Sequence, residues 1–242
     1  MPALRRILIA STLAVSALAW PVAAARKADN ADEIERLRKS MDVLRDLTSN
    51  PDKAIPWRRL RDAEAIVVIP SLVKGGFVIG AKHGRGVMSV REAGERHFSP
   101  PGFVTMTGGT IGWQIGVESI DLVLLIMNRK GVNDLLSDKF TLGGSASVAA
   151  GPVGAGADAQ SDVKMSAQVL AYSRASGLFA GATLEGGSLR GDRDANEDFY
   201  GVKAIDLRTI VLANAPKTHP PDIADQWHDL LTSLTNPKAP GR

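Results

Sequence analysis

The stretch from Ala149 to Gly191 constrains the fold of this chain most, because glycine and alanine are interspersed there with larger apolar residues. A flexible linker rich in glycine and serine would lack the larger residues. A pleated, half-buried strand surface requires them, and glycine interrupts such a surface where two backbones approach closely. Of the 24 glycines in the chain, 16 lie between Gly102 and Gly191. The region is therefore predicted to form strongly curved antiparallel sheet.

Ordered motifs in this region resemble the SYLF lipid-binding domain. In chain order they are Gly151-Pro152-Val153-Gly154, Tyr172-Ser173-Arg174, Ser176 to Gly181, Glu185-Gly186, and Asn196 with Phe199-Tyr200-Gly201. The resemblance extends upstream through Ile55-Pro56, Ala65 to Pro70, Gly75-Gly76-Phe77, Gly84 to Val87, and Gly112 with Gln114 and Gly116. It covers about residues 52–215 and defines the expected SYLF-like domain.

The resemblance implies a non-enzymatic binding module. Eukaryotic members of the family associate with phosphoinositides and other acidic lipids, and some bind actin filaments. Bacterial members are mostly uncharacterised envelope proteins. An actin-binding activity transfers poorly to an envelope protein, because it meets actin only if it is delivered outside the cell.

The first 25 residues have the order of a secretory signal peptide. Arg5 and Arg6 precede an apolar run from Ile7 to Ala19, and small residues follow up to Ala25. The run is too short to span a bilayer as a helix, which needs about 20 residues. We expect export to the periplasm or secretion, with cleavage near Ala25. The chain has no cysteine, so it is expected to carry neither a lipoprotein anchor nor a disulfide.

Net charge argues against nucleic acid as a partner. Without residues 1–25, the chain keeps 217 of its 242 residues, enough for one substantial domain. The loss of Arg5 and Arg6 leaves 27 lysines and arginines against 26 acidic residues. A near-neutral domain lacks the electrostatic footprint of a nucleic-acid-binding protein.

The N-terminal segment, residues 26–51, is predicted to form a helix, because Ile34, Leu37, Met41 and Leu44 form one apolar stripe. The stripe could lie on a membrane surface or pack against the domain. Four basic and five acidic residues lie between Ala31 and Ser49. A membrane-surface helix usually has a strongly basic polar face, so packing is the favoured interpretation.

An arginine cluster beside a tryptophan is the candidate lipid-binding site. Arg58, Arg59 and Arg61 adjoin Trp57, and guanidinium forks bind phosphate while an indole suits a lipid interface. Lys74 and Arg85 are expected to add to this basic rim. The alternative is an ordinary solvated helix face, in which Asp52, Asp62 and Glu64 neutralise the arginines.

The predicted fold class is α+β: a curved, mostly antiparallel, glycine-rich sheet, with a barrel-like shape as an open alternative, flanked by N- and C-terminal helices. Ala65–Pro70 is predicted to be a buried strand, and residues 120–127 a central one. Residues 77–81 and 86–90 are expected to form a hairpin that turns through residues 82–85. Residues 216–242 are expected to hold a linker and a helix with an apolar stripe.

Known catalytic and metal-binding motifs fit the chain poorly. Asp192, Asp194 and Asn196 begin like a calcium-binding loop, but Glu197 and Lys203 stand where glycine and glutamate are required. A solvated helix start is the favoured interpretation. The histidines show no zinc-ligand spacing, and no nucleophile elbow or phosphate loop is present. The histidines are His83, His97, His219 and His228. We expect no enzyme activity, cofactor or metal.

The sequence thus predicts a non-enzymatic lipid-binding module of the bacterial envelope. Its partner would be anionic membrane lipid, with phospholipid or phosphoinositide-type headgroups, at a peripheral membrane contact. The alternative is a structural or protein-interaction envelope protein, in an assembly or associated with the outer membrane. Of the polar residues within the family motifs, most are expected to hold the fold through buried hydrogen bonds. They are Tyr172, Arg174, Glu185 and Asn196.

Overall fold

The computed structural model describes residues 30–49, 54–92, 94, 97–137, 140–154, 167–173, 184–212 and 220–236. The expected signal peptide, residues 1–25, lies outside the described residues, as do Arg174 and His219.

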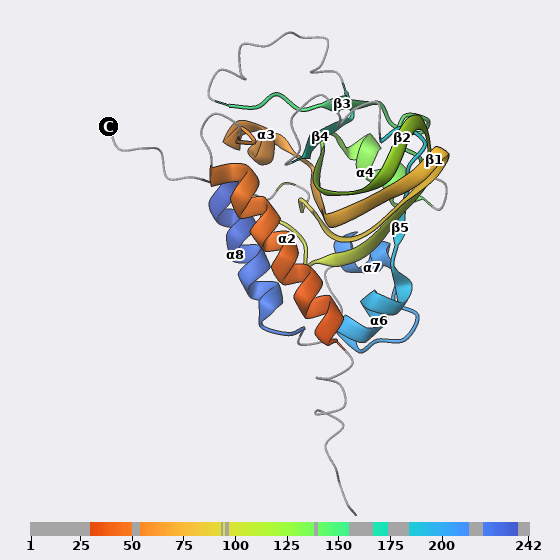
Figure 1. Ribbon diagram of the computed structural model, residues 1–242. Helices are drawn as coiled ribbons and strands as arrows, with labels where there is room; N and C mark the ends of the chain where they lie inside the picture. Colours follow the sequence, from red (N-terminus) through yellow and green to blue (C-terminus); the bar gives the residue numbers. More distant parts are fainter. Residues whose placement is uncertain are drawn as a thin grey trace, which may run out of the picture.

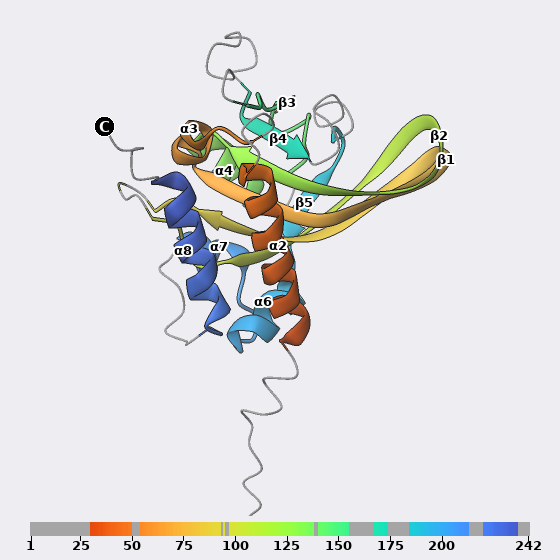
Figure 2. The ribbon, with the colours of Figure 1, turned by 60° about the vertical axis from the view of Figure 1, so that its left-hand side comes forward.

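One long antiparallel ribbon forms the centre of the molecule. It consists of β1 (Ala65–Val90) and β2 (Gly102–Ile126), paired from Ala65↔Ile126 to Met88↔Gly102. The ribbon folds back on itself, so that its two limbs face each other across a bend (Figure 2). We call residues 73–81 of β1 and 109–119 of β2 the bend, which register shifts near Gly76 help to form.

Glycine permits the close approach of the two limbs. A Cβ on Gly86 would lie 2.3 Å from the carbonyl oxygen of Val68, and one on Gly84 would lie 2.7 Å from Cγ2 of Ile69. The predicted turn through residues 82–85 is therefore wrong. These residues are extended and pair with residues 105–108 of β2, because the glycines serve close packing between limbs and not a reversal of the chain.

Within the described residues, three shorter strands extend the ribbon into a mixed sheet on β2. β4 (Val169–Ser173) is antiparallel to the end of β2, and β3 (Val148–Ala150) is parallel to β4. β5 (Ser188–Gly191) pairs with the start of β2. The order is β1-β2-β4-β3 with β5 beside β2, so the prediction of a central strand at residues 120–127 is confirmed. Over the described residues the sheet does not close into a barrel, and the α+β class is confirmed.

Helices from the two ends of the chain lie side by side against β1. α2 (Ala31–Ser49) and α8 (Ile223–Thr235) form this pair (Figure 1). The predicted stripe of α2 faces the core, where Leu37, Met41 and Leu44 are buried. The packing interpretation of this helix is therefore confirmed.

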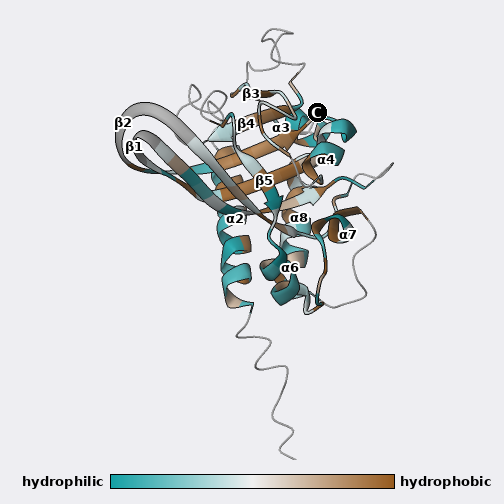
Figure 3. Ribbon diagram, turned by 90° about the vertical axis from the view of Figure 1, so that its right-hand side faces the viewer, coloured by the Kyte–Doolittle hydropathy of each residue, from teal (hydrophilic) through white to brown (hydrophobic). Residues whose placement is uncertain are grey.

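In the described part of the chain, four short helices connect the remaining elements. They are α3 (Trp57–Asp62), α4 (Arg129–Leu135), α6 (Arg193–Tyr200) and α7 (Leu207–Leu212). Hydrophobic strand segments lie inside, while α2 and α6 show hydrophilic faces to the outside (Figure 3). Among the described helices, none combines the length and apolar character needed to cross a membrane.

Candidate functional site

The candidate site is α3, a helix of six residues that is held by contacts with the rest of the domain. An isolated helix of this length is unstable in water. Leu60 anchors α3 in the core, and Arg91 caps its C-terminal end. Nε of Arg91 donates to the Ala63 carbonyl at 2.9 Å, and Nη2 donates to the carbonyls of Arg61 at 2.6 Å and Leu60 at 3.3 Å. These bonds satisfy carbonyls that the helix itself leaves without donors.

Arg91 is itself fixed in place. Its guanidinium lies 4.4 Å from the centroid of the Phe98 ring, and burial lowers the pKa of Arg91. Nη2 of Arg129 donates to the Arg91 carbonyl at 2.6 Å, and Nε of Arg129 pairs with Glu64 at 2.7 Å. Arg91 thus links the C-terminal end of α3 to the rest of the domain, and Arg129 fixes Arg91 and Glu64 in turn. For this reason α3 is a rigid platform.

The outward face of α3 combines an indole with two guanidinium groups. Trp57 is 44% exposed, which is high for so large an apolar side chain. The guanidinium carbons of Arg61 and Arg58 lie 4.9 and 5.7 Å from the centroid of the Trp57 ring. Nε of Arg61 pairs with Asp62 at 2.9 Å, but both side chains are about half exposed. Such exposed pairs are weak, so an incoming anion can compete with Asp62.

A second exposed apolar residue lies in the segment that contacts the residues before α3. The amide of Gly154 donates to the Ala54 carbonyl at 3.1 Å, which brings the segment after β3 to the residues that precede α3. Val153 in that segment is 43% exposed. We call Trp57, Arg58, Arg61 and Val153 the α3 surface. Guanidinium groups bind phosphate or carboxylate in a forked geometry, and an indole prefers the boundary between water and lipid.

Arg59 lies apart from the other two arginines of α3. It is half-buried, and its charge acts on the phenol of Tyr172. Burial raises the pKa of Tyr172, while Arg59 opposes this rise. Among the described residues, the Tyr172 hydroxyl is buried without a hydrogen-bond partner, so Tyr172 is an exception to the expectation that most of these polar residues form buried hydrogen bonds. Its ring packs against the backbone at Gly151.

The structure does not bring Lys74 and Arg85 to the α3 surface. Lys74 lies at the start of the bend, nine residues beyond Ala65, which corresponds to roughly 30 Å of extended chain. Its side chain is only 13% exposed and its Nζ lies 3.9 Å from Glu118. Arg85 is exposed on the other limb of the ribbon, opposite Thr105.

Lys82, which was expected in a turn of residues 82–85, is instead a buried lysine in the ribbon. Lys82 is 1% exposed, and its Nζ donates to the backbone carbonyl of Glu185 at 2.9 Å. Burial, and secondarily the charge of Lys74, lower the pKa of Lys82. The bond fastens the turn before β5 to the ribbon. The signal in the sequence was the alternation of Lys82 with Gly84 and Gly86, which places all three on the inner face of the strand.

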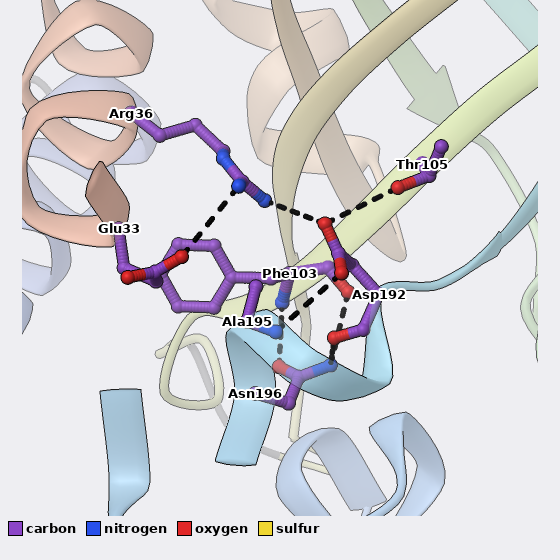
Figure 4. Close-up of polar contacts among 7 residues, drawn as sticks. All are labelled: Glu33, Arg36, Phe103, Thr105, Asp192, Ala195 and Asn196. Carbon is purple, nitrogen blue, oxygen red and sulfur yellow. Dashed lines mark hydrogen bonds and ion pairs between the residues drawn. The ribbon is translucent and has the colours of Figure 1, made fainter. Parts of the chain in front are cut away.

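A buried ion pair joins α2 to the segment before α6 (Figure 4). Nη1 of Arg36 donates to Oδ2 of Asp192 at 2.9 Å, and Oγ1 of Thr105 donates to the same oxygen at 3.2 Å. The Arg36 guanidinium also lies 5.3 Å from the centroid of the Phe103 ring and 3.6 Å from Glu33. Burial raises the pKa of Glu33.

Asp192 and Asn196 are both used inside the fold. Oδ1 of Asp192 accepts from the amide of Ala195 and caps α6, so the predicted helix start is confirmed. The expectation that this start is solvated is wrong, because the Asp192 side chain is 15% exposed and Asn196 is fully buried. The Asn196 side chain bonds both the amide and the carbonyl of Phe103, at 2.8 and 3.1 Å. The predicted structural role of Asn196 is confirmed. Within the described ranges, no group of three or more histidine, aspartate or glutamate side chains is placed to hold a metal ion.

The fold and the α3 surface define a class of protein: an α+β binding module that presents cations and an exposed indole on a rigid platform. Residues 107–234 match the family described as Las17-binding protein actin regulator, Ysc84. This match covers more than half of the chain, so the chain belongs to the Ysc84/SYLF family. The resemblance inferred from the motifs is confirmed.

Relatives with similar sequences come from animals and yeast. The chain is 32% identical over 204 residues to SH3 domain-containing YSC84-like protein 1 of Xenopus laevis, covering 82% of this chain and 59% of that protein. The human protein of the same name is 31% identical over 206 residues, covering 82% of this chain and 58% of that protein. LAS seventeen-binding protein 3 of Saccharomyces cerevisiae (strain YJM789) is 32% identical over 185 residues, covering 75% of this chain and 39% of that protein. The chain thus spans less than two thirds of the length of these curated relatives.

Proposed function

We propose that this chain is a non-enzymatic module that binds anionic headgroups at a membrane surface through the α3 surface. The observation that carries the proposal is the exposed indole of Trp57 with the Arg58 and Arg61 guanidinium groups within 6 Å of its ring. The guanidinium groups would contact headgroup phosphates, while Trp57 and Val153 would lie at the lipid interface. Because Arg91 fixes the backbone of α3, little ordering cost would accompany binding.

The membrane in this proposal belongs to the bacterial envelope. The order of charged, apolar and small residues in residues 1–25 supports export, and the periplasm or the medium is then the compartment in which the domain acts. Phospholipids with anionic headgroups are the proposed ligands, and contact is peripheral. Arg59 supports α3 from the interior side and is not part of the contact.

Co-sedimentation with vesicles tests the proposal. The double variant Arg58→Gln and Arg61→Gln removes two charges, and the matched control, Arg38→Gln and Arg45→Gln, removes two from exposed positions on α2. Binding by the wild type is expected to rise with the anionic lipid fraction and to weaken with salt. The α3 variant should lose most of this salt-sensitive binding, and the control should keep it. Equal losses in both variants would show that only net charge matters and would contradict a site on α3.

A protein partner is the second candidate function. The description of the family and the name of the yeast relative both denote proteins that bind another protein. An exposed tryptophan beside arginine is also the commonest composition of an energetic centre in a protein interface. A wild-type chain that binds no vesicle of any composition would favour this alternative.

A further inference from the structure

The tip of the bend is a protruding surface without charged residues in its sequence. It projects away from α2 and α8 (Figure 2). No aspartate, glutamate, lysine, arginine or histidine occurs in residues 75–81 or 108–117, which form it. Natural proteins usually place charges on exposed strands to prevent association. A bend that lacks them has the composition of a contact surface.

Two valines mark the outer face of the bend. Register pairs Val73 with Ser119 and Gly75 with Val117, so these four residues share one face of the ribbon, which we call the valine face. Leu72 is on the opposite face. Its Cδ1 lies 2.9 Å from the position that a Cβ on Gly84 would occupy, so the face of Leu72 looks toward the other limb. The valine face is therefore convex and points away from the domain.

The exposed fractions of the two valine side chains agree with their placement on the convex face. Val117 is 81% exposed and Val73 is 44% exposed. Gly75, the residue opposite Val117, has no side chain that could cover it. The nearest charges in the sequence, Lys74 and Glu118, alternate with these residues and so lie on the concave face, where they approach within 3.9 Å. The four residues of the valine face therefore carry no charge, and Asp121, two residues beyond Ser119 on the same side of β2, marks the end of the uncharged area.

We propose that the valine face inserts shallowly into the interfacial region of a lipid bilayer. This inference rests on the proposed membrane function and adds to it an apolar component that salt does not weaken. Among the described strands, none pairs with the outer edges of the bend. Backbone groups without partners cannot enter hydrocarbon, so insertion stops at the headgroup and upper acyl level.

The size of the bend favours lipid over a second copy of the chain. Nine residues, 73–81, at about 3.3 Å each and a ribbon width of about 10 Å give a face of roughly 300 Å². A stable protein interface buries about 800 Å² on each partner. A bilayer does not need to match the shape of the protein surface. A few inserted side chains are therefore enough for a peripheral contact that the α3 surface reinforces.

A single labelled cysteine reports insertion directly, because the chain has no native cysteine. Val117→Cys carries an environment-sensitive fluorophore and is mixed with vesicles of phosphatidylcholine, with and without phosphatidylserine. We expect a blue shift, a several-fold rise in intensity, and stronger quenching by a nitroxide near the headgroups than by one deep in the chains. The control is Leu212→Cys on α7, at a residue that is 41% exposed, where no change is expected. An unchanged signal at position 117 on vesicles that bind the protein would overturn the proposal.

Val117→Asp separates this inference from the function proposed for α3. An exposed position tolerates aspartate, and circular dichroism checks that the fold is kept. We expect about tenfold weaker partitioning into both vesicle types, as for the loss of one inserted valine. If Val117→Asp binds normally while the Arg58 and Arg61 variant does not, the α3 function stands and insertion is wrong. The reverse result supports insertion and removes the α3 site.

Two further outcomes overturn insertion. If the wild type binds no vesicle, both membrane proposals fail together. If light scattering shows a wild-type dimer that Val117→Asp converts to a monomer without lipid, the valine face is a protein interface.

Discussion

At the scale of single residues, Gly151 shows how closely the backbone approaches a buried ring. A Cβ at this position would lie 2.0 Å from Cζ of Tyr172, and the ring is confined because Tyr172 is buried. We expect Gly151→Ala to lower the free energy of unfolding by about 1–3 kcal/mol, the usual cost of an overpacked core. Urea denaturation followed by circular dichroism measures it.

Gly144→Ala is the matched control for this substitution. The nearest atom to a Cβ at Gly144 is 3.8 Å away, an ordinary contact. Alanine there also restricts the unfolded chain, so stability should stay the same or rise slightly. Equal destabilisation by both substitutions would mean that the contact with Tyr172 is not the cause.

Glu33 gives the protein a pH dependence of known sign. Burial raises its pKa above the ordinary 4.5, although Arg36 opposes the rise. Above pH 4.5 the folded chain therefore binds more protons at this site than the unfolded chain, and stability falls as pH increases through the folded pKa. Glu33→Gln cannot ionise, so its urea midpoint should exceed that of the wild type at pH 7. The difference should shrink below pH 4.5; a lower midpoint at pH 7 would contradict the sign.

The structural role of Asn196 could be predicted from its residue type, but its bonding partners could not. Asn196 was expected to form buried hydrogen bonds, and its amide bonds both backbone groups of Phe103. Tyr172 belongs to the same set, most of which was expected to form such bonds, but its hydroxyl has no partner in the described part of the chain. Whether a buried polar side chain finds a partner depends on which backbone groups the fold brings close to it. The partner of Asn196, Phe103, is 93 positions away in the sequence.

At the scale of secondary-structure elements, the helices were predicted well and the ribbon was not. The stripe of α2 repeats within each turn, so local sequence shows both its extent and its buried face. Glycine in a strand, in contrast, marks either a turn or a close approach of two backbones. Gly84 and Gly86 make the second kind of contact, with Val68 and Ile69 of the facing limb. Nothing in residues 82–85 alone distinguishes the two.

Gly86→Ala tests whether this close approach keeps the two limbs of the ribbon packed against each other. Its Cβ would meet the Val68 carbonyl oxygen at 2.3 Å and the Ile69 Cα at 3.1 Å, and backbone atoms cannot rotate away. We expect a loss of about 2–3 kcal/mol in the free energy of unfolding. Gly109→Ala is the control, because the only atom near its Cβ is 4.0 Å away. A stable Gly86→Ala variant with native circular dichroism would show that the limbs can separate at no cost.

At the scale of the whole molecule, the two ends of the chain depend on one core. Nε1 of Trp227 on α8 donates to Oγ of Ser89 on β1 at 2.9 Å, although 138 residues separate them. α2 lies beside α8 and is joined to α6 through Arg36 and Asp192. Such contacts are invisible to local sequence patterns, which predicted apolar stripes on both helices but not the surfaces that they cover.

Because α2, α8 and the ribbon share this core, Trp227→Ala should destabilise the entire domain and not only α8. Trp227 is fully buried, and its removal should cost about 3–5 kcal/mol out of a typical total of about 5–15. Circular dichroism and the fluorescence of the remaining tryptophans should shift together to lower urea. Trp57→Ala provides the control, since the same change at an exposed indole should leave stability almost unaltered. If helical signal were lost before the fluorescence changed, α8 would be a separately unfolding appendage, and the shared core would not be a single cooperative unit.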